Sequence, residues 1–466
     1  MSAPMAHVVI AGGGIVAWSA AAALRRQIPS LEVTVVSCPV PPDALADRMI
    51  STLPSIAGFH EDIGLADSDT LHRAKSGLRL GTIFEGWATG RAPYVHAYGS
   101  YGTPVEGIPF YQLWLRAREE EQGIPPFDHF SIAAQLGRAG RIGSAAVSAP
   151  ESTQIGYGLN LTLERYHALM RDYALHLGAI ERSSGSFEPR LRGEDGFIEA
   201  LALDDGADLK GDLFVDCSGP CASIRSALGE RFDDWSSWLP CNRLILVEGS
   251  AAPGPPLLDI SAACSAGWKW EASSPSRSSR GIVFSKTHVT SDEALAQLGG
   301  AVESAVEVGV SSGRWAQPWL RNCVAIGDAA VAAEPLEWAS LHLAHSQLDR
   351  LISMMPGRDC APVELAEYNR QCGDEADRVR DFICMHYVTA RRDDGFWKDA
   401  SAIDPPDSLA HTLALFAERG RLPYYEEETF SRDSWAAVLL GQGIEPVRID
   451  PLADSLPADQ IRSELV

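Results

Sequence analysis

The residues of this chain best suited to chemistry are an acid in an apolar segment and a cation in an expected strand. Glu337 follows Pro335 in the mostly apolar run of residues 331–344. An unpaired carboxylate is costly to bury, so Glu337 requires a partner or a functional role unless it lies in water at a helix start. Arg79 stays protonated at any practical pH and offers several donors that orient a polar ligand. Arg79 is therefore a candidate partner of Glu337, or a structural cation paired with an acid such as Glu85.

Four aromatic residues are candidates for the wall of a site. Trp268 and Trp270 are two positions apart, which places both on one face of a strand. Phe396 and Trp397 are neighbours in a later segment. Large aromatic side chains also pack well in a core, so each pair belongs either to a substrate pocket or to the hydrophobic interior. His386, in an expected helix, is interpreted as a core residue.

A glycine turn between a strand and a helix identifies a candidate phosphate site near the N-terminus. Residues 7–11 have a strand pattern, and Gly12-Gly-Gly14-Ile-Val-Ala17 fits the G-x-G-x-x-G/A turn that opens an alanine-rich helix. Glycine at such a turn lets the backbone approach a pyrophosphate, which the helix N-terminus attracts. Gly12, Gly14 and Ala17 are therefore expected to bind a dinucleotide, although a bare structural turn gives the same pattern.

A second glycine element lies far along the chain. Residues 324–326 have the pattern of a short buried strand, and Gly327 and Asp328 follow at an expected helix start. An aspartate there can hold a ribityl hydroxyl of a flavin beside the helix N-terminus. Near the first element, the strand pattern of residues 32–36 ends in Ser37, so a hydroxyl rather than an acid would bond the ribose. The paired elements predict a dinucleotide-binding α/β fold.

The composition describes an acidic globular protein. Of 466 residues, 45% are hydrophobic and 22% are charged, and the formal net charge is −23. This charge disfavours nucleic acid, which requires clustered lysine and arginine, and no apolar run approaches the length of a membrane span. No secretory signal precedes the first strand, so we expect a cytoplasmic protein without membrane or nucleic-acid partners. The nine cysteines lack paired spacing, which favours reduced thiols over disulfides or a metal site.

The length predicts more than one structural unit. We expect a discontinuous FAD-binding domain from residues 1–110, 155–235 and 310–355. A substrate-binding, mostly helical module would come from residues 111–154, 236–309 and 356–466. Periodicity predicts a strand over residues 78–84, a helix over 161–177 and a long helix over 365–390, and residues 253–256 and 273–279 have the composition of loops.

The order of short motifs along nearly the whole chain resembles that of the flavin-dependent tryptophan halogenase family. Besides the glycine turn with Trp18, the matching segments are Thr52-Leu-Pro-Ser-Ile56, Asp216-Cys-Ser-Gly219, Trp235-Ser-Ser-Trp-Leu-Pro-Cys241, Gly267-Trp-Lys-Trp270, Gly327-Asp328, Glu334-Pro-Leu-Glu337, Asp381-Phe-Ile-Cys-Met-His-Tyr387 and Asp394-Gly-Phe-Trp397. So many motifs in the same order are not expected by chance.

This resemblance implies an FAD-binding, Rossmann-like fold of the GR2 type found in flavin monooxygenases, with a mostly helical substrate and C-terminal module. It also implies a reaction. Reduced FAD would react with oxygen to a flavin hydroperoxide, which chloride or bromide would attack. The resulting hypohalous acid would pass through a tunnel to an electron-rich aromatic substrate, indole-like or phenolic. A separate flavin reductase would supply the reduced cofactor, and the sequence is compatible with a homodimer.

The resemblance also implies roles for single residues. Glu337 matches a glutamate that assists electrophilic attack, and Arg79 falls where the family has a lysine at the tunnel end. The other implied roles are separation of substrate from flavin for Trp268 and Trp270, a substrate pocket for Phe396 and Trp397, flavin contacts for Thr52 and Pro335, and a halide site for Ala339 and Ser340.

Several positions depart from the family pattern. A guanidinium cannot act as the nucleophilic amine that a lysine provides, so Arg79 would orient hypohalous acid through hydrogen bonds instead of forming an N-halogenated intermediate. Met49-Ile-Ser-Thr52 replaces a Gly-Glu-Ala-Thr strap beside flavin and tunnel, and Trp338-Ala339 replaces Ser-Thr after the glutamate. These changes leave two alternatives to a halogenase: an FAD-dependent monooxygenase on the same fold, and a non-catalytic homologue that retains the scaffold.

Overall fold

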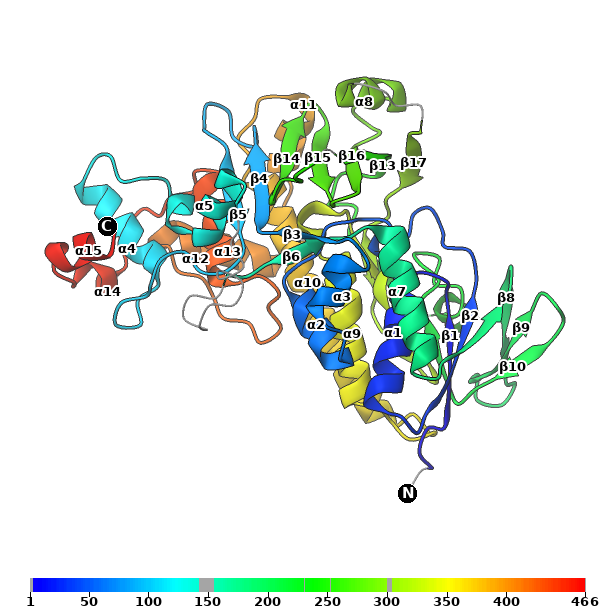
Figure 1. The fold of residues 1–466 in the computed structure, drawn as a ribbon. Coiled ribbons are helices and arrows are strands. Elements are labelled where there is room, and N and C mark those ends of the chain that lie inside the picture. The colour runs from blue at the N-terminus through cyan, green and yellow to red at the C-terminus, as the bar shows by residue number, and fades with distance from the viewer. Residues whose placement is uncertain (1–2, 142–154, 230, 252, 300–303, 466) are drawn as a thin grey trace.

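An open parallel sheet forms the half of the molecule that contains the N-terminus (Figure 1). The computed structural model describes residues 3–141, 155–229, 231–251, 253–299 and 304–465. Five strands run parallel in the order β7-β2-β1-β11-β20, and the short β19 lies antiparallel at one edge. Their bounds are His7–Ala11 for β1, Glu32–Ser37 for β2, Ile180–Ser183 for β7, Leu213–Asp216 for β11, Trp319–Leu320 for β19 and Cys323–Ala325 for β20.

Three helices cover one face of this sheet. They are α1 (Ile15–Gln27), α7 (Leu163–His176) and α9 (Ser340–Ser353), with α1 between the other two (Figure 1). Residues 20–23 of α1 are alanines that are at most 3% exposed, and their small side chains let the neighbouring helices approach. A small antiparallel sheet packs against the opposite face through its own apolar cluster; its strands are β8 (Phe187–Leu191), β9 (Ile198–Leu203) and β10 (Asp208–Lys210).

A second, mainly antiparallel sheet forms much of the other half. Its seven strands follow the order β17-β13-β16-β15-β14-β4-β5, in which β14 and β4 are parallel. This sheet lies largely in the module that the sequence predicted to be helical. The loop predicted over residues 273–279 is a hairpin in which residues 274–276 lie outside the strands. The bounds are Val306–Gly309 for β17, Arg243–Ser250 for β13, Arg277–Phe284 for β16, Gly267–Ser273 for β15, Leu258–Cys264 for β14, Gly81–Glu85 for β4 and Tyr94–Ala97 for β5.

The strand predicted over residues 78–84 is in fact two strands. β3 (Gly77–Arg79) pairs with β6 (Gly158–Asn160), whereas β4 begins at Gly81 and joins the seven-stranded sheet. Gly81 has a φ of +149°, and a Cβ there would lie 2.3 Å from the carbonyl oxygen of His96. This position therefore requires glycine, and Arg79 is the last residue of its strand.

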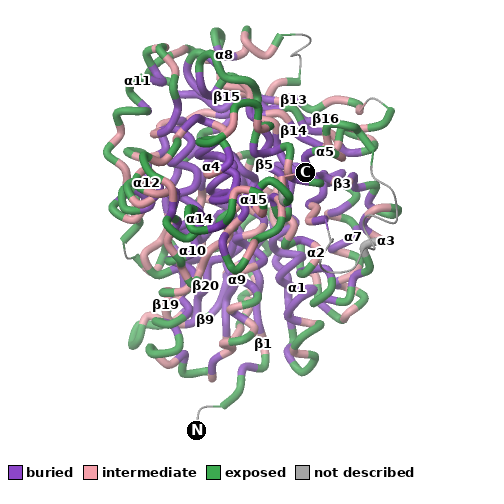
Figure 2. The backbone as a smooth tube through the Cα atoms, turned by 90° about the vertical axis from the view of Figure 1, so that its left-hand side faces the viewer, coloured by how far each residue is buried: buried purple, intermediate pink, exposed green. Residues whose placement is uncertain are grey.

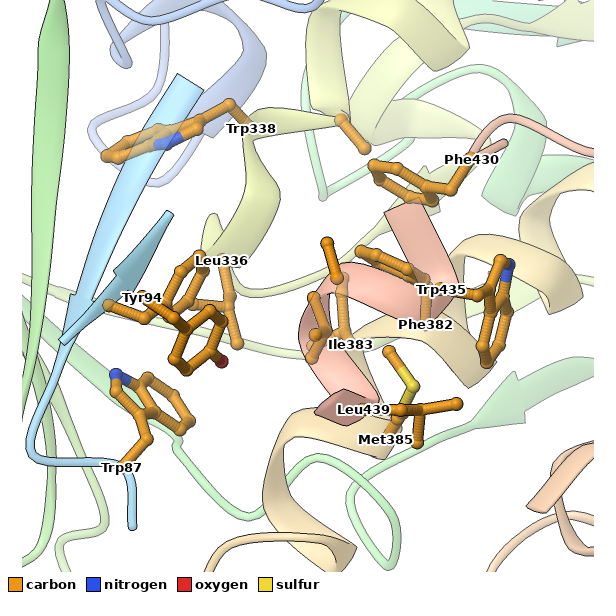
Figure 3. Packing of buried hydrophobic residues seen from close by; sticks show 14 of the residues in the cluster. Trp87, Tyr94, Leu336, Trp338, Phe382, Ile383, Met385, Phe430, Trp435 and Leu439 are labelled. Atoms are coloured by element: carbon orange, nitrogen blue, oxygen red, sulfur yellow. The ribbon is translucent and has the colours of Figure 1, made fainter. Parts of the chain in front are cut away.

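Helices fill the C-terminal part of the chain, as predicted. The helix expected over residues 365–390 is α10 (Pro362–Val388), and its Phe382 packs edge-on against Trp435 of α13 (Arg432–Gly441) with 5.0 Å between ring centroids (Figure 3). Among the described helices, none has both the length and the low charge needed to cross a bilayer. The remaining helices of the second half are α4 (Phe110–Glu120), α5 (Ile132–Ala139), α8 (Ser291–Leu298), α11 (Gly395–Ser401), α12 (Asp407–Arg419), α14 (Pro451–Asp454) and α15 (Ala458–Glu464).

The predicted α/β class is confirmed, and the buried segments in Figure 2 include most of β1, β20 and α1. The predicted domain boundaries assign β4 and β5 to the same domain as the parallel sheet. These two strands instead hydrogen-bond to each other, and β4 also pairs with β14 of the seven-stranded sheet. The predicted boundary between residues 154 and 155 coincides with residues 142–154, which lie outside the described residues. The two-unit division therefore stays a prediction.

Candidate active site

Glu337 lies in an unusual turn between β21 (Val331–Ala332) and α9. Within the short helix Leu336–Trp338, both Glu337 and Trp338 have left-handed backbone angles, with φ of 68° and 61°. Non-glycine residues adopt this conformation at a cost of about 1–3 kcal/mol each, which surrounding contacts must offset. The Glu337 side chain is 2% exposed, so this turn holds a carboxylate inside the protein.

Two histidines contact the Glu337 carboxylate. Nδ1 of His96, in β5, lies 2.9 Å from both Oε1 and Oε2, and Nε2 of His386, in α10, lies 3.0 Å from Oε1. The partner of Glu337 is therefore not Arg79, as the sequence suggested, and His386 belongs to the site as well as to the core. Sequence reasoning missed His96, for which the available signal was a histidine within the otherwise apolar pattern of residues 94–97.

The surroundings fix the charge of Glu337. Burial by itself raises the pKa of this carboxyl, but the charge of His96 and the close contact with His386 outweigh burial and hold the pKa well below its usual range. Burial lowers the pKa of His386, and the contact with Glu337 opposes this shift. Glu337 is thus a carboxylate at any practical pH, and it suits the stabilisation of positive charge on a neighbouring group.

Arg79 forms a fully buried ion pair with Asp259 of β14. Its Nε donates to Oδ2 of Asp259, and both side chains are 0% exposed. Asp259 also accepts hydrogen bonds from Ser51 Oγ at 2.7 Å and from Asn160 Nδ2 at 2.9 Å. The acid that neutralises Arg79 is therefore Asp259, and not Glu85 or Glu337 as the sequence suggested.

The remaining contacts of Arg79 place it beside the Glu337 turn. Nη1 donates to the Thr52 carbonyl at 3.2 Å and Nη2 donates to the Thr82 hydroxyl, so three of the five N–H groups are used. The guanidinium carbon lies 5.1 Å from the ring centroid of Tyr98 and 5.9 Å from that of Trp338. Trp338, which stands where the resemblance gives a serine, thus connects the Arg79 environment with the Glu337 turn.

The four aromatic residues expected at the substrate site are buried. Trp270 packs edge-on against Trp338 with 6.3 Å between ring centroids, and Phe396 is 2% exposed. These contacts are those of core packing, and a wall between substrate and flavin stays a prediction. The indole N–H groups donate within the protein: that of Trp268 to Tyr387 Oη, that of Trp270 to Ser279 Oγ and that of Trp397 to the Cys264 carbonyl.

The two residues expected at a halide site follow the Glu337 turn directly. Ala339 is 4% exposed and precedes α9, and Ser340 is the first residue of that helix. The unpaired N–H groups of a helix start favour anions. A halide site at Ala339 and Ser340 stays a prediction.

The two glycine elements lie next to each other, as one cofactor site requires. A Cβ on Gly327 would lie 3.1 Å from Val16 in the first turn of α1. Gly12 has a φ of +148°, and a Cβ there would lie 2.4 Å from a carbonyl oxygen. Cavities of about 280 and 300 Å³ lie at this place; both are lined by Arg48, Glu248 and Arg277, and the first also by Gly14 and Ile15.

The groups that would recognise FAD are present, and several of them are bonded within the protein. The start of α1 and Asp328 fit a pyrophosphate and a ribityl chain, but the short turn η1 (Leu45–Asp47) lies between them. The Thr52 hydroxyl is bonded to the Leu159 backbone. Burial raises the pKa of Asp47 to about 6 and that of Asp328 to about 8.

The remaining expected contacts with FAD are Ala17, buried in α1, Ser37, half-buried at the end of β2, and Pro335, buried beside Glu337.

The fold and the site define a class of protein. A dinucleotide crevice at the glycine turn of a parallel sheet, with a separate buried carboxylate reached by the second sheet and α10, is the organisation of a flavin-dependent oxidoreductase.

Comparisons with known proteins agree with this class. A family model described as tryptophan halogenase matches residues 7–458. The tryptophan 6-halogenase SttH of Streptomyces toxytricini is 27% identical over 497 residues, which cover 97% of this chain and 93% of SttH. The chain belongs to the tryptophan halogenase family, whose members are enzymes that use reduced FAD.

Solved structures show the same likeness. BrvH, a flavin-dependent halogenase from Brevundimonas sp. BAL3, is 34% identical with a TM-score of 0.92, and the match covers 99% of this chain and 95% of BrvH. Xcc4156, a flavin-dependent halogenase from Xanthomonas campestris, is 30% identical with a TM-score of 0.91, and the match covers 99% and 94% of the two chains.

Proposed function

We propose that this protein is a flavin-dependent halogenase that adds chlorine or bromine to an electron-rich aromatic ring, indole-like or phenolic. The observation that carries the proposal is Glu337, a buried carboxylate kept ionised by His96 and His386. Electrophilic substitution creates positive charge on a ring carbon, and a fixed carboxylate in a low-dielectric site stabilises such charge.

Each residue of the site has a part in this reaction. The ring forms a carbon–halogen bond with the electrophile, and Glu337 stabilises the resulting cation and accepts the proton that leaves the substituted carbon. His96 and His386 are positioning residues that orient the carboxylate. Arg79 keeps two N–H groups beyond its bonds to Asp259, Thr52 and Thr82, and these would orient the halogen donor.

FAD, reduced by a separate flavin reductase, would react with oxygen, and this reaction would supply the oxidising equivalent that converts chloride or bromide into the electrophile. In the crevice, the start of α1 would bind the pyrophosphate. The residues proposed to contact FAD are Gly12, Gly14, Ala17, Ser37, Thr52, Asp328 and Pro335, and those proposed to border the halide are Ala339 and Ser340.

The substrate would enter through a cavity of about 560 Å³ on the helical side of Glu337. Phe430 lines this cavity and stacks on Phe382, with 3.9 Å between the ring centroids (Figure 3). The centroid of the Phe430 ring also lies 6.2 Å from that of the His96 ring. A rotation of Phe430 would therefore connect the cavity with the His96–Glu337 pair. The residues proposed to complete the pocket are Trp268, Trp270, Phe396 and Trp397.

Product analysis tests the proposal. The protein is incubated with FAD, a flavin reductase, oxygen, bromide and a panel of indoles and phenols, with a scavenger of free hypobromous acid present. We expect brominated rings that the scavenger does not suppress. Hydroxylated products without brominated products would support an FAD-dependent monooxygenase, which the replacement of the family lysine by Arg79 favours. Failure to bind reduced or oxidised FAD would support a non-catalytic homologue.

Replacing His386 should make halogenation sensitive to acid. In the wild type Glu337 remains ionised, so its protonation should not reduce turnover between about pH 5 and 8. Its depressed pKa likewise contributes stability that is present above about pH 4.3 and lost only as the pH falls through the folded value. In His386→Asn one contact that lowers the pKa of Glu337 is weakened while burial remains, so the pKa of Glu337 rises. As the solution is acidified, turnover should therefore begin to fall at a higher pH than in the wild type.

The pH profile of kcat measures this effect. His411→Asn, at an exposed position of α12, is the matched control and should reproduce the wild-type profile. Superimposable acid limbs for His386→Asn and the wild type would show that His386 does not control the charge of Glu337.

A further inference from the structure

Two groups that the nucleotide crevice would offer to a cofactor are bonded to one turn of the protein itself. The turn is η1 (Leu45–Asp47). Oδ1 of Asp47 accepts a hydrogen bond from the backbone N–H of Val16 at 3.1 Å, in the first turn of α1. The adjacent Ala46 donates its backbone N–H to Oδ2 of Asp328 at 2.8 Å. A carboxylate therefore lies where the start of the helix would otherwise receive a phosphate.

The glycine turn is covered by the same carboxylate. A Cβ on Gly14 would lie 2.3 Å from Oδ1 of Asp47. The Asp47 carboxylate therefore occupies the space beside Gly14 that the absence of a side chain leaves open for a phosphate. Asp47 lines the cavity of about 280 Å³, Leu45 lines the cavity of about 300 Å³, and Arg48 lines both. The turn thus divides one crevice into two parts.

We propose that the Leu45–Asp47 turn is an internal competitor of FAD, and that Asp47 occupies the pyrophosphate position in the flavin-free protein and leaves it when FAD binds. This inference rests on the proposed cofactor. In the exchange, the N–H groups at the start of α1 replace a carboxylate oxygen with a phosphate oxygen, and Asp328 replaces the Ala46 N–H with a hydroxyl of the flavin side chain. The apparent affinity for FAD is reduced by the fraction of molecules in which the turn is closed.

Arg48 favours the exchange once Asp47 has left. It directly follows Asp47, and its side chain borders both parts of the crevice. The Nη2 atom lies 3.4 Å from the Val40 carbonyl, a long contact that binds the guanidinium weakly. Two phosphates in the joined crevice would pair with this cation, whereas the closed turn keeps an acid beside it.

Equilibrium binding tests the proposal on the full chain. Flavin-fluorescence titration should give a dissociation constant for FAD about fivefold lower in Asp47→Ala than in the wild type, the change that corresponds to the loss of one helix cap. Lumiflavin, which has neither a phosphate nor a ribityl chain, should bind both proteins equally. Asp43→Ala removes the same charge from the same segment, and its affinity for FAD should stay within about twofold of the wild type.

Hydrogen exchange of the unaltered protein gives a second measurement, which does not depend on how a variant folds. FAD should expose the amide of Ala46 and leave the amide of Val16 protected, because a phosphate replaces Asp47 there. An Ala46 amide that stays protected in the FAD complex would overturn the proposal, as would an unchanged or weaker FAD affinity in Asp47→Ala. Either result leaves the halogenase proposal intact, whereas a lack of FAD binding by both proteins would defeat both proposals.

Discussion

Glu337→Gln should lower aromatic halogenation about 10²–10³-fold, because the amide keeps the shape of the side chain but removes both its charge and its ability to take a proton. The expected loss lies in kcat, since FAD is proposed to bind in a different part of the protein. The measurement is the single-turnover rate of product formation at saturating substrate, together with the dissociation constant for FAD in the same variant.

A neighbouring glutamate provides the matched control. Glu334 is also buried, at 1% exposed, but burial raises its pKa to about 8, although the neighbouring Tyr387 and Cys241 act in the opposite direction. Glu334 is therefore mostly protonated at neutral pH, and Glu334→Gln replaces one neutral group by another. Turnover in Glu334→Gln should stay within about threefold of the wild type. Full activity of Glu337→Gln would remove Glu337 from the chemistry.

The elements built from local pattern could be predicted from the sequence. The helix expected over residues 161–177 is α7 (Leu163–His176), and the glycine turn after residues 7–11 opens α1 as expected. Such elements depend on spacing within a few residues, which a sequence shows directly. The seven-stranded sheet was not predicted, because residues distant in sequence form it, as when β14 pairs with β4.

The partners of the candidate catalytic residues could not be predicted for the same reason. His96 contacts Glu337 across 241 positions, and Asp259 contacts Arg79 across 180 positions. A charged residue in an apolar pattern indicates that a partner is needed, because an unpaired buried charge is costly. Which acid or imidazole is that partner depends on the fold. The left-handed angles of Glu337 and Trp338 were equally hidden, since non-glycine residues rarely adopt them and tertiary contacts must impose them.

Asp259→Asn should lower the free energy of unfolding by about 3–5 kcal/mol, because it leaves the Arg79 guanidinium charged in a fully buried site. Urea unfolding followed by tryptophan fluorescence measures this loss. The control is Asp208→Asn, which breaks an exposed pair with Arg190 and should cost less than about 1 kcal/mol. A loss of similar size in both variants would mean that the Arg79–Asp259 pair is no more important than a surface pair.

Changes on the arginine side then separate the structural role of Arg79 from its proposed chemical role. Arg79→Lys keeps the charge opposite Asp259, so it should preserve halogenation or raise it, although a lysine paired with Asp259 stays protonated and cannot carry halogen covalently. Arg79→Met combined with Asp259→Leu removes both charges and should recover most of the stability lost in Asp259→Asn. If this folded double variant binds FAD but no longer halogenates, the guanidinium acts on the halogen donor. If it halogenates normally, Arg79 only supports the fold, and the chemistry depends on Glu337 and its two histidines.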